Sequence, residues 1–405
     1  MRLKIVGDAG TGKTTSILRY CKEFDAIILS HTRVAVNVIN YRDPSVRCST
    51  LHSFALRFPD FFGFAKKSLE IGIEKIRMEF CAKHGIPYST NAYIKKKGNN
   101  LFTAYSKLVN TAYPTGDLSE FQDEVISFAE KYEKFKIEKG LIDYEDMLKY
   151  LYDVAEKGEL VLGPVIVDEA QDLSPLQSKI INMSSEFIVM AGDELQSIFG
   201  FHGAKPEIFE NFCNNSIILG KNYRIKKKVW DFTGKIVERQ LRRKRAEAVN
   251  DGGCVQVLPP MGYKEIARLI NSLQGKKMVL FRYNEDVVIM KAFVEDSENT
   301  IIDTIHACKG RECPTVILVD GSEEKRTEEE ERVWYVGATR CRDHLIIIPF
   351  IVREPFLTYC YDFAEKADIA SVISENRRIL SENKSLSDKQ QKREPKESPP
   401  ALQVF

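Results

Sequence analysis

The stretch Gly7-Asp8-Ala9-Gly10-Thr11-Gly12-Lys13-Thr14 decides the fold, because it fits the pattern G-x-x-x-x-G-K-[ST] of a phosphate-binding loop. An apolar run at residues 3–6 precedes it and a helical stretch at residues 14–24 follows it, as such a loop requires. Glycines let the backbone wrap around phosphate oxygens, and N–H groups at a helix start favour an anion. We expect Lys13 to reach the β- and γ-phosphates and the Thr14 hydroxyl to bind Mg²⁺. The predicted nucleotide contacts in this loop are Gly7, Ala9, Gly10, Thr11, Gly12, Lys13, Thr14 and Thr15.

A pair of acidic residues, Asp168 and Glu169, follows the apolar run at residues 165–167. Such a position is the carboxyl edge of a buried strand, where ligands of α/β proteins sit. Asp168 suits Mg²⁺ binding, and Glu169 suits orienting or deprotonating an attacking water. An apolar run followed by two acids is also typical of a surface turn, and the phosphate loop favours the catalytic interpretation.

Two regions of the chain alternate short Val- and Ile-rich runs with amphipathic helical stretches, which is typical of parallel sheets buried on both faces. The runs lie at residues 3–6, 26–29, 46–50, 164–167 and 187–191 in the first region, and at 216–219, 254–258, 278–281, 300–305, 315–319 and 344–348 in the second. Residues 59–140 are rich in Lys, Glu, Phe and Tyr, which predicts a helical insertion into the first region. The polar, charged chain beyond residue 366 predicts a disordered tail.

Composition limits the kind of partner and the compartment. The 59 Lys and Arg balance 58 Asp and Glu, so a nucleic acid would have to be held by local basic patches. The nine cysteines contain no C-x-x-C pair, which argues against a zinc site or a disulfide framework and favours reduced thiols. We find no signal peptide and no run long enough to cross a bilayer. We therefore expect a cytoplasmic (or nucleoid or nuclear) protein that is neither secreted nor bound to a membrane.

The residues around the phosphate loop and around the acidic pair resemble the UvrD/Rep/PcrA family of superfamily 1 helicases. In chain order after the phosphate loop, the similar blocks are Ser30-His31-Thr32-Arg33, Thr50-Leu51-His52-Ser53-Phe54, Asp168-Glu169-Ala170-Gln171-Asp172, residues 191–204 (AGDELQSIFGFHGA), Asn222-Tyr223-Arg224, residues 304–312 (TIHACKGRE) and Tyr335-Val336-Gly337-Ala338-Thr339-Arg340. The resemblance runs from Gly7 to about Ile348, with every block in order.

The resemblance implies an α/β fold of two RecA-like P-loop NTPase domains with parallel sheets. Residues 1–58 and 141–205 would form the first domain, with the P-loop and the Walker B box. Residues 59–140 would form a helical insertion (1B-like), residues 206–365 the second domain, and residues 366–405 the disordered charged tail.

The resemblance also implies the roles of the site residues. Arg224 and Arg340 would reach the γ-phosphate from the second domain, and Gln196 would sense it from the first. Tyr223 would stack on adenine and Glu312 would contact the ribose or the coupling network. The expected catalytic set is Glu169, Gln196, Arg224 and Arg340, with ATP and Mg²⁺ as cofactors. Plainer interpretations are a solvated helix start for Arg224, a surface ion pair for Arg340, a core position for Tyr223 and a turn cap for Gln196.

Nucleic-acid contacts are implied in the same way. The resemblance places His31, Thr32, Thr50, His52, Phe199, Phe201 and His306 along a single strand. Single strands are held by backbone contacts and by stacking on aromatic rings, and Phe201 occupies the stacking position. Core packing of Phe201 and structural roles for His52 and His306 are the plainer alternatives. Residues 221–245 carry eleven Lys and Arg, but charge runs are usually solvated faces.

We therefore expect an ATP-dependent helicase or translocase on single-stranded DNA, with 3′ to 5′ movement and a role in DNA repair or replication. RNA remains open as the track, and we expect a monomer. One alternative is a DNA-stimulated ATPase that displaces proteins or remodels recombination intermediates without unwinding. An alternative of another class is a nucleotide-switched binding protein with little hydrolysis.

Three departures from the family pattern bear on these expectations. The strand before the phosphate loop begins at Met1, which leaves no room for the family's upstream adenine-reading Gln motif. Only 80 residues separate Arg224 from Thr304, so the large 2B insertion cannot fit and we expect a compact form. His202 replaces an Arg and Phe199 a Tyr. The chain ends in Pro-Pro-Ala-Leu-Gln-Val-Phe, which suits a docking peptide for a replication or repair partner on the tail.

Overall fold

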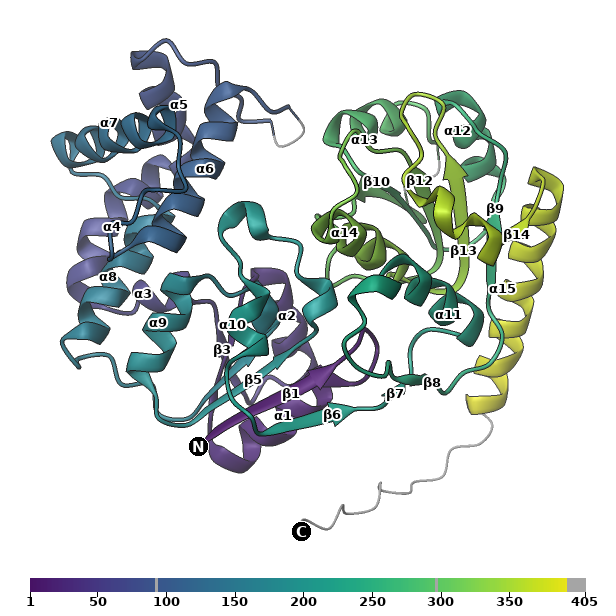
Figure 1. Cartoon of the computed structure of the whole chain (residues 1–405), viewed down its shortest axis with the longest axis horizontal. Helices are drawn as coiled ribbons and strands as arrows, with labels where there is room; N and C mark the ends of the chain where they lie inside the picture. The colour runs from purple at the N-terminus through teal and green to yellow at the C-terminus, as the bar shows by residue number, and fades with distance from the viewer. Residues whose placement is uncertain (92–93, 296–297, 392–405) are drawn as a thin grey trace.

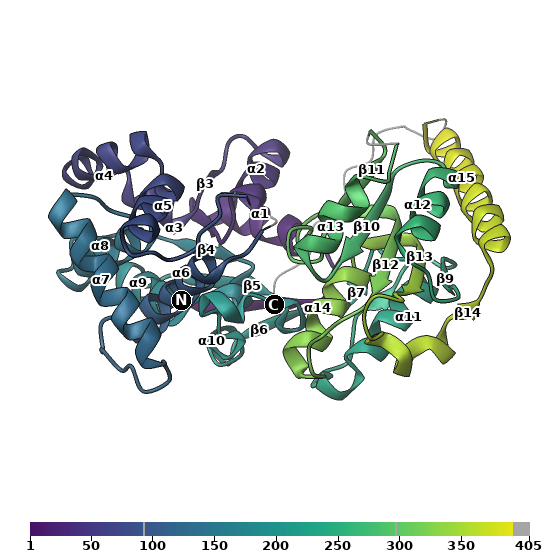
Figure 2. The same ribbon diagram turned by 90° about the horizontal axis from the view of Figure 1, so that it is seen from above.

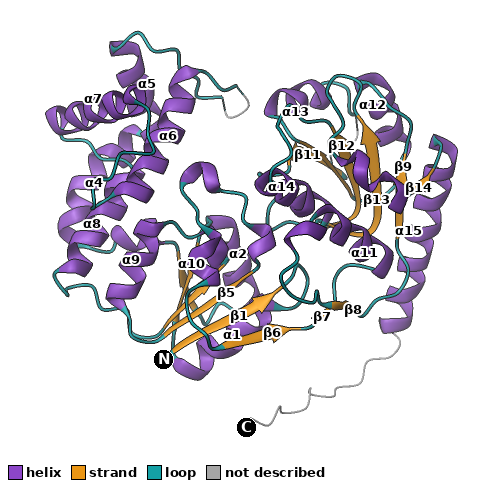
Figure 3. Cartoon of the chain, viewed as in Figure 1, coloured by secondary structure: helices purple, strands orange, loops and turns teal. Residues whose placement is uncertain are grey.

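The computed structural model describes residues 1–91, 94–295 and 298–391. It contains two six-stranded parallel sheets, each in its own lobe, with a helical region standing on the first lobe (Figure 1, Figure 3). Viewed from above, the two lobes lie side by side (Figure 2). The expected fold class, α/β with two parallel sheets and a helical insertion in the first, is confirmed. In the described residues, no helix is long and apolar enough to span a bilayer.

The first sheet has the strand order β3-β2-β4-β5-β1-β6. Its strands are β1 (Arg2–Gly7), β2 (Ile27–Ser30), β3 (Arg47–Ser49), β4 (Val165–Asp168), β5 (Ile188–Gly192) and β6 (Ser216–Leu219). Alternate side chains of β2 point to opposite faces: Ile28 packs with α1 (Lys13–Phe24) and α2 (Arg33–Arg42), whereas Ile27 and Leu29 pack toward the helical region. Both faces are covered, which is why these strands are almost wholly apolar.

The second sheet has the order β11-β10-β12-β13-β9-β14. Its strands are β9 (Cys254–Val257), β10 (Lys277–Phe281), β11 (Thr300–Thr304), β12 (Cys313–Asp320), β13 (Cys341–Pro349) and β14 (Glu365–Lys366). One face carries α11 (Lys227–Ile236) and α14 (Glu328–Ala338), with Trp230 and Trp334 in the core. The other carries α12 (Tyr263–Ser272) and α13 (Asn284–Lys291).

One predicted strand lies in the other lobe. We expected residues 216–219 in the second sheet, but β6 pairs in parallel with β1, with Lys4 opposite Ser216 and Gly7 opposite Leu219. The first lobe therefore extends to residue 219, beyond the boundary expected at residue 205, and the chain crosses to the second lobe between β6 and β7 (Lys221–Asn222). The physical reason is that β1 would be an open sheet edge without β6. A short apolar run such as residues 216–219 can pair with a strand of either sheet, so the sequence does not distinguish them.

The helical region is inserted between β3 and β4. Its helices are α3 (Leu51–Ala55), α4 (Pro59–Ile71), α5 (Ile73–Lys83), α6 (Lys97–Ala112), α7 (Asp123–Lys139) and α8 (Tyr144–Glu156). Helix α8 lies wholly beyond the end of the insertion expected at residue 140, and it packs on α9 (Pro175–Ser184) of the first lobe. This contact joins the insertion to the lobe.

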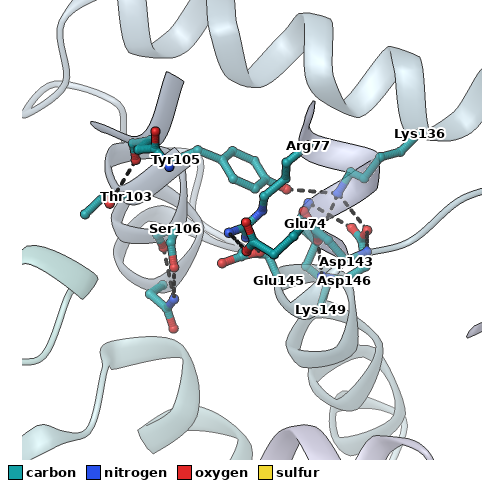
Figure 4. A network of polar contacts seen from close by, with 12 residues as sticks. Glu74, Arg77, Thr103, Tyr105, Ser106, Lys136, Asp143, Glu145, Asp146 and Lys149 are labelled. Atoms are coloured by element: carbon teal, nitrogen blue, oxygen red, sulfur yellow. Dashed lines mark hydrogen bonds and ion pairs between the residues drawn. The ribbon is translucent and has the colours of Figure 1, made fainter. Parts of the chain in front are cut away.

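A buried charge network holds α7 to α8 (Figure 4). The Lys136 ammonium lies 2.6 Å from an Asp146 oxygen and 3.1 Å from an Asp143 oxygen, and it also donates to the Tyr105 hydroxyl. Buried ions need such pairing, because an uncompensated charge away from water is costly.

The tail expected to be disordered from residue 366 instead begins with a helix, α15 (Ile369–Gln391), which runs along the outer side of the second lobe (Figure 1). Val372 and Ile379 are buried, and Asn376 accepts a hydrogen bond from the Gln274 N–H at 3.0 Å. Val372 and Ile379 are seven positions apart and so share one helical face, which composition alone does not reveal. The docking peptide expected at the chain end lies outside the described residues.

Candidate nucleotide site and nucleic-acid groove

The phosphate loop joins β1 to α1 through two glycines in left-handed conformations, Gly10 at φ 77° and Gly12 at φ 87°. Helix α1 begins at Lys13, so its first N–H groups point into the loop. The Lys13 ammonium donates to the backbone carbonyls of Gly7 at 2.7 Å and Asp8 at 3.1 Å, and the Thr11 hydroxyl donates to the same Asp8 carbonyl at 2.8 Å. The loop therefore has the backbone form that cradles phosphate oxygens.

The two acids at the end of β4 meet different electrostatic environments. Burial, reinforced by the neighbouring Glu169, raises the pKa of Asp168 to about 7. Burial also acts to raise the pKa of Glu169, but Lys309 and Lys13 outweigh it and the net direction is downward. Glu169 has φ 54°, a strained conformation for a residue with a side chain, and its carboxylate accepts from the Gln171 amide at 2.7 Å. The fold thus fixes an ionised carboxylate beside the phosphate loop.

The second lobe contributes Arg340, two residues beyond the end of α14. Its guanidinium is 2% exposed and donates to the Gln196 side-chain oxygen of the first lobe at 2.9 Å. Gln196 in turn donates to Asp193 at 2.6 Å. Burial lowers the pKa of Arg340 to about 10, which leaves the group charged at neutral pH. Arg340 is therefore part of a contact between the lobes and not of a surface ion pair.

The Asn222-Tyr223-Arg224 block lies directly against the phosphate loop. The Tyr223 N–H donates to the Gly10 carbonyl at 3.0 Å, while the Tyr223 side chain is 60% exposed. A Cβ added at Gly10 would meet Asn222 Oδ1 at 2.6 Å, so this close approach requires glycine. Arg224 forms an ion pair with Glu312 at 2.5 Å. Tyr223 is therefore not a core residue, and its ring has a free face for stacking.

These residues surround one cavity of about 510 Å³ between the lobes. Of the predicted nucleotide, metal and catalytic residues, its walls contain Ala9, Gly10, Thr11, Gly12, Lys13, Thr14, Thr15, Asp168, Glu169, Gln196, Tyr223, Arg224, Glu312 and Arg340. Gly7 is the predicted member outside the lining, at the end of β1. Lys13 and Arg340 thus face one crevice, as a shared triphosphate site demands.

Six of the seven predicted nucleic-acid residues fall into two groups. His31 and Phe199 of the first lobe and His306 of the second form a run of rings, with centroids 5.6 Å apart from His31 to Phe199 and 6.3 Å from Phe199 to His306. Phe201 extends this run, 5.5 Å from His306, and is 37% exposed. Burial lowers the pKa of both His31 and His306 to about 3, so these rings are neutral. The run crosses from one lobe to the other.

The second group lines a cavity of about 780 Å³ beside this run, between the first lobe and the helical insertion. Thr50 and His52 are on its wall, together with His31 and Phe199. The Thr50 hydroxyl already caps α3 by accepting from the Ser53 N–H. Thr32 caps α2 in the same way and lines the nucleotide cavity instead. We call this 780 Å³ cavity the insertion groove.

Two residues with central contacts were not assigned roles from the sequence. Lys309 lies 2.5 Å from Asp172 and donates to the Gln196 carbonyl at 2.6 Å, which joins the lobes beside the cavity. The sequence does point to Lys309, because it lies inside the family-like block at residues 304–312. Arg243 pairs with Asp8 of the phosphate loop at 2.5 Å, and no local spacing could show a partner so distant in sequence.

A phosphate loop on one parallel sheet, faced by an arginine from a second, defines a two-lobed P-loop protein. Comparison with family models then identifies it: the UvrD/REP helicase N-terminal domain matches residues 31–216, and the UvrD-like helicase C-terminal domain matches residues 300–348. The chain belongs to the UvrD-like superfamily 1 helicases.

Curated relatives support the same family. An ATP-dependent helicase/nuclease protein of Clostridium novyi is 32% identical over 34% of this chain, and the putative ATP-dependent DNA helicase YjcD of Bacillus subtilis is 29% identical over 42%. The alignments span only 13% and 25% of those relatives. Among solved structures, the arterivirus nonstructural protein 10 helicase aligns over 86% of this chain and 59% of its own, at 12% identity and a TM-score of 0.41. That similarity is too low to add to the argument.

Proposed function

We propose that this protein is an ATP-driven translocase on single-stranded DNA that moves 3′ to 5′. The observation that carries the proposal is the single cavity in which Lys13 and Glu169 of the first lobe face Arg340 of the second. Phosphoryl transfer depends mainly on positioning and on neutralising charge, and this cavity holds the side chains for both.

Each residue has a defined part in the proposed reaction. Lys13 binds the phosphates, Glu169 orients the attacking water and accepts its proton, and Arg340 neutralises charge on the transferred phosphoryl group. Thr14 and Asp168 offer a hydroxyl and a carboxylate oxygen, the donor type that Mg²⁺ prefers, and Mg²⁺ would supply further charge neutralisation there.

Hydrolysis becomes movement because both the nucleotide site and the ring run join the two lobes. Arg340 binds Gln196 across the cavity, and the run from His31 to His306 spans the same boundary. A change in the grip on the γ-phosphate therefore changes the spacing of the rings on which bases would stack. The 3′ to 5′ direction and the preference for DNA rest on the family resemblance and, with the expected monomeric state, belong to this proposal.

Steady-state ATPase assays with poly-dT, poly-U, duplex DNA and no polymer test the proposal at fixed salt. We expect poly-dT to stimulate turnover most, and Lys13→Ala and Glu169→Gln to abolish it. Turnover in the wild type that no polymer stimulates would contradict translocation, and negligible turnover under every condition would favour a nucleotide-switched binding protein.

A specific observation favours movement without strong unwinding. Between Arg224 and Thr304, within the part of the chain that the structure describes, the second lobe contains only its own helices and strands, so no separate subdomain stands there to engage a duplex. We expect displacement of streptavidin from a 3′- or 5′-biotinylated oligonucleotide to exceed strand separation of a tailed duplex. Efficient strand separation would show a full helicase, and the end from which streptavidin is displaced reports the direction.

A further inference from the structure

We propose that Arg243 is a positioning residue for the nucleotide site: from the second lobe, it neutralises the buried Asp8 carboxylate of the phosphate loop and so sets the affinity for the triphosphate. The inference rests on the proposed function and adds a residue to it. The loop pattern G-x-x-x-x-G-K-[ST] leaves position 8 open, so the motif does not imply this pair.

Asp8 is fully buried, and both its carboxylate oxygens are bonded to the second lobe. One oxygen lies 2.5 Å from a terminal nitrogen of Arg243, and the other accepts the Ala246 N–H at 2.7 Å. Arg243 also binds Glu194 through Nε at 3.0 Å. Glu194 begins the short turn η2 (Glu194–Gln196), which carries Gln196. Arg243 therefore contacts both the phosphate loop and the turn that faces the γ-phosphate.

The segment that carries Arg243 is held firmly to the second lobe. The Arg245 guanidinium stacks 3.6 Å from the centre of the Trp230 ring and donates to the Thr233 hydroxyl at 2.7 Å. The Trp230 ring N–H donates to the Ala246 carbonyl at 2.7 Å. Ala246 is followed by β8 (Glu247–Ala248), which pairs with β7, where the chain enters the second lobe. Arg243 is thus fixed beside the crossing point between the lobes.

The charge on Asp8 matters for triphosphate binding because the backbone carbonyl of the same residue contacts Lys13. The Asp8 carbonyl accepts from the Lys13 ammonium and the Thr11 hydroxyl, so this carboxylate belongs to the residue that the phosphate-binding lysine contacts. Without Arg243, a buried carboxylate beside the phosphate cradle would be left without its cation. It would repel a triphosphate and compete for Lys13. Arg243 removes that repulsion without occupying the cavity, whose lining does not include it.

Four variants of the full chain test this inference: Arg243→Met, Asp8→Asn, the double variant, and Arg242→Met as a control. Arg242 is the neighbouring arginine, but it is largely exposed and pairs with Glu210. The readouts are KM and kcat for ATP, and the Kd of a fluorescent ATP analogue by anisotropy. We expect Arg243→Met to raise KM and Kd about tenfold with kcat within about threefold of wild type. Asp8→Asn removes the buried charge itself, so it should raise KM and Kd less than Arg243→Met does.

The double variant separates charge neutralisation from a merely structural role. Once Asp8 has lost its charge, Arg243 no longer has a phosphate-loop carboxylate to neutralise, so the double variant should bind ATP as tightly as Asp8→Asn alone and more tightly than Arg243→Met. A KM for Arg243→Met equal to that of Arg242→Met, or a double variant as weak as Arg243→Met, would overturn the inference. Should Arg243→Met not fold, Arg243→Gln in the same cycle gives the same two comparisons. Wild-type protein that binds the analogue but never hydrolyses ATP would refute the proposed function. The Kd values of the single and double variants would still decide whether Arg243 sets the affinity for the triphosphate.

Discussion

Arg340, which faces the phosphate loop, is hydrogen-bonded to both lobes. Arg340 donates to the Val336 carbonyl at 2.9 Å, to the Arg311 carbonyl at 3.2 Å and to Gln196 at 2.9 Å. The first two bonds, and another to the Thr339 hydroxyl at 3.0 Å, fix the side chain to its own lobe. The bond to Gln196 crosses to the other lobe, so the guanidinium is positioned before any phosphate arrives. Pre-organised donors of this kind need no rearrangement during the reaction.

Removing this group should therefore affect catalysis far more than binding. We expect Arg340→Ala to lower kcat roughly 10³-fold or more, with a small change in KM, since an arginine finger is worth about 10³–10⁵ in rate. Arg340→Lys should recover little, because an ammonium lacks the planar fork. ATPase kinetics at saturating poly-dT measure both, with the exposed Arg268→Ala as the control. An Arg340→Ala enzyme within about tenfold of wild-type kcat would remove Arg340 from the catalytic set.

Phe201 offers the test of the ring run that leaves the nucleotide cavity intact. Its ring is partly exposed and lies outside the lining of that cavity. Stacking of one base on an aromatic ring is worth about 1–3 kcal/mol, so Phe201→Ala should weaken oligo-dT binding roughly 5- to 150-fold. The KM for ATP without DNA should not change. Fluorescence anisotropy gives the Kd, with Phe293→Ala, a similarly exposed phenylalanine of the second lobe, as control. Equal affinity of the two variants would make Phe201 a packing residue.

At the scale of elements, the helices of the insertion are joined by ion pairs as well as by apolar contacts. Helix α5 meets α8 through Arg77 and Glu145, 3.4 Å apart, and both residues line the insertion groove. Burial, followed by the nearby Asp143, raises the pKa of Glu145 to about 7. The groove wall therefore contains a carboxyl group whose charge changes near neutral pH.

The sign of the resulting pH dependence follows from linkage. An unfolded chain releases the Glu145 proton near its ordinary pKa, about 4.3, whereas the folded chain retains it to about 7. Glu145 thus favours the folded state most at low pH, and this contribution is lost as pH rises through about 7. From about pH 5 to 8 we expect wild type to lose stability relative to Glu145→Gln, by at most about 1.4 kcal/mol per pH unit. Thermal unfolding across that range measures the difference in Tm. The surface variant Glu138→Gln should show no trend, and a flat or reversed trend for Glu145→Gln would contradict the assignment.

Elements were predictable where their signal is local. The phosphate loop, the strand before Asp168 and the helical character of residues 59–140 follow from spacing and composition that one element contains by itself. Strand β6 joined the other lobe because the neighbour of a parallel strand is chosen by tertiary packing, which the run at residues 216–219 does not encode. Helix α15 was missed because two buried apolar residues on a charged helix hardly change its composition. The Arg243–Asp8 pair joins distant segments and left no local trace.

At the scale of the whole molecule, the most basic stretch of the sequence is held largely in ion pairs. Seven of the eleven cations in residues 221–245 pair with acids: Arg224 with Glu312, Lys226 with Asp343, Lys227 with Asp231, Lys235 with Glu238, Arg242 with Glu210, Arg243 with Asp8 and Lys244 with Glu247. This stretch, which looks like a polyanion-binding patch in sequence, is therefore largely neutralised. With a net charge of +1, the molecule also has little long-range attraction for DNA.

The salt dependence of DNA binding should reflect the few unpaired cations of the insertion groove. In the insertion groove, Arg33 and Lys95 are exposed cations, and within the part of the chain that the structure describes neither forms an ion pair, whereas Arg77 is paired with Glu145. Each phosphate neutralised on a single strand contributes about −0.7 to the slope of log K against log salt. We therefore expect a shallow slope for oligo-dT, about −1.4 from these two residues, and a large residual affinity from stacking at high salt.

Two variants separate the groove cations from the rest of the surface. Arg33→Met with Lys95→Met should bring the slope close to zero, while Lys66→Met, an exposed lysine outside the groove, should leave it unchanged. Binding isotherms from about 50 to 200 mM salt give the three slopes. A wild-type slope of about −5 or steeper would correspond to roughly seven neutralised phosphates. The strand would then lie on a much larger basic surface, and the insertion groove would not be its path.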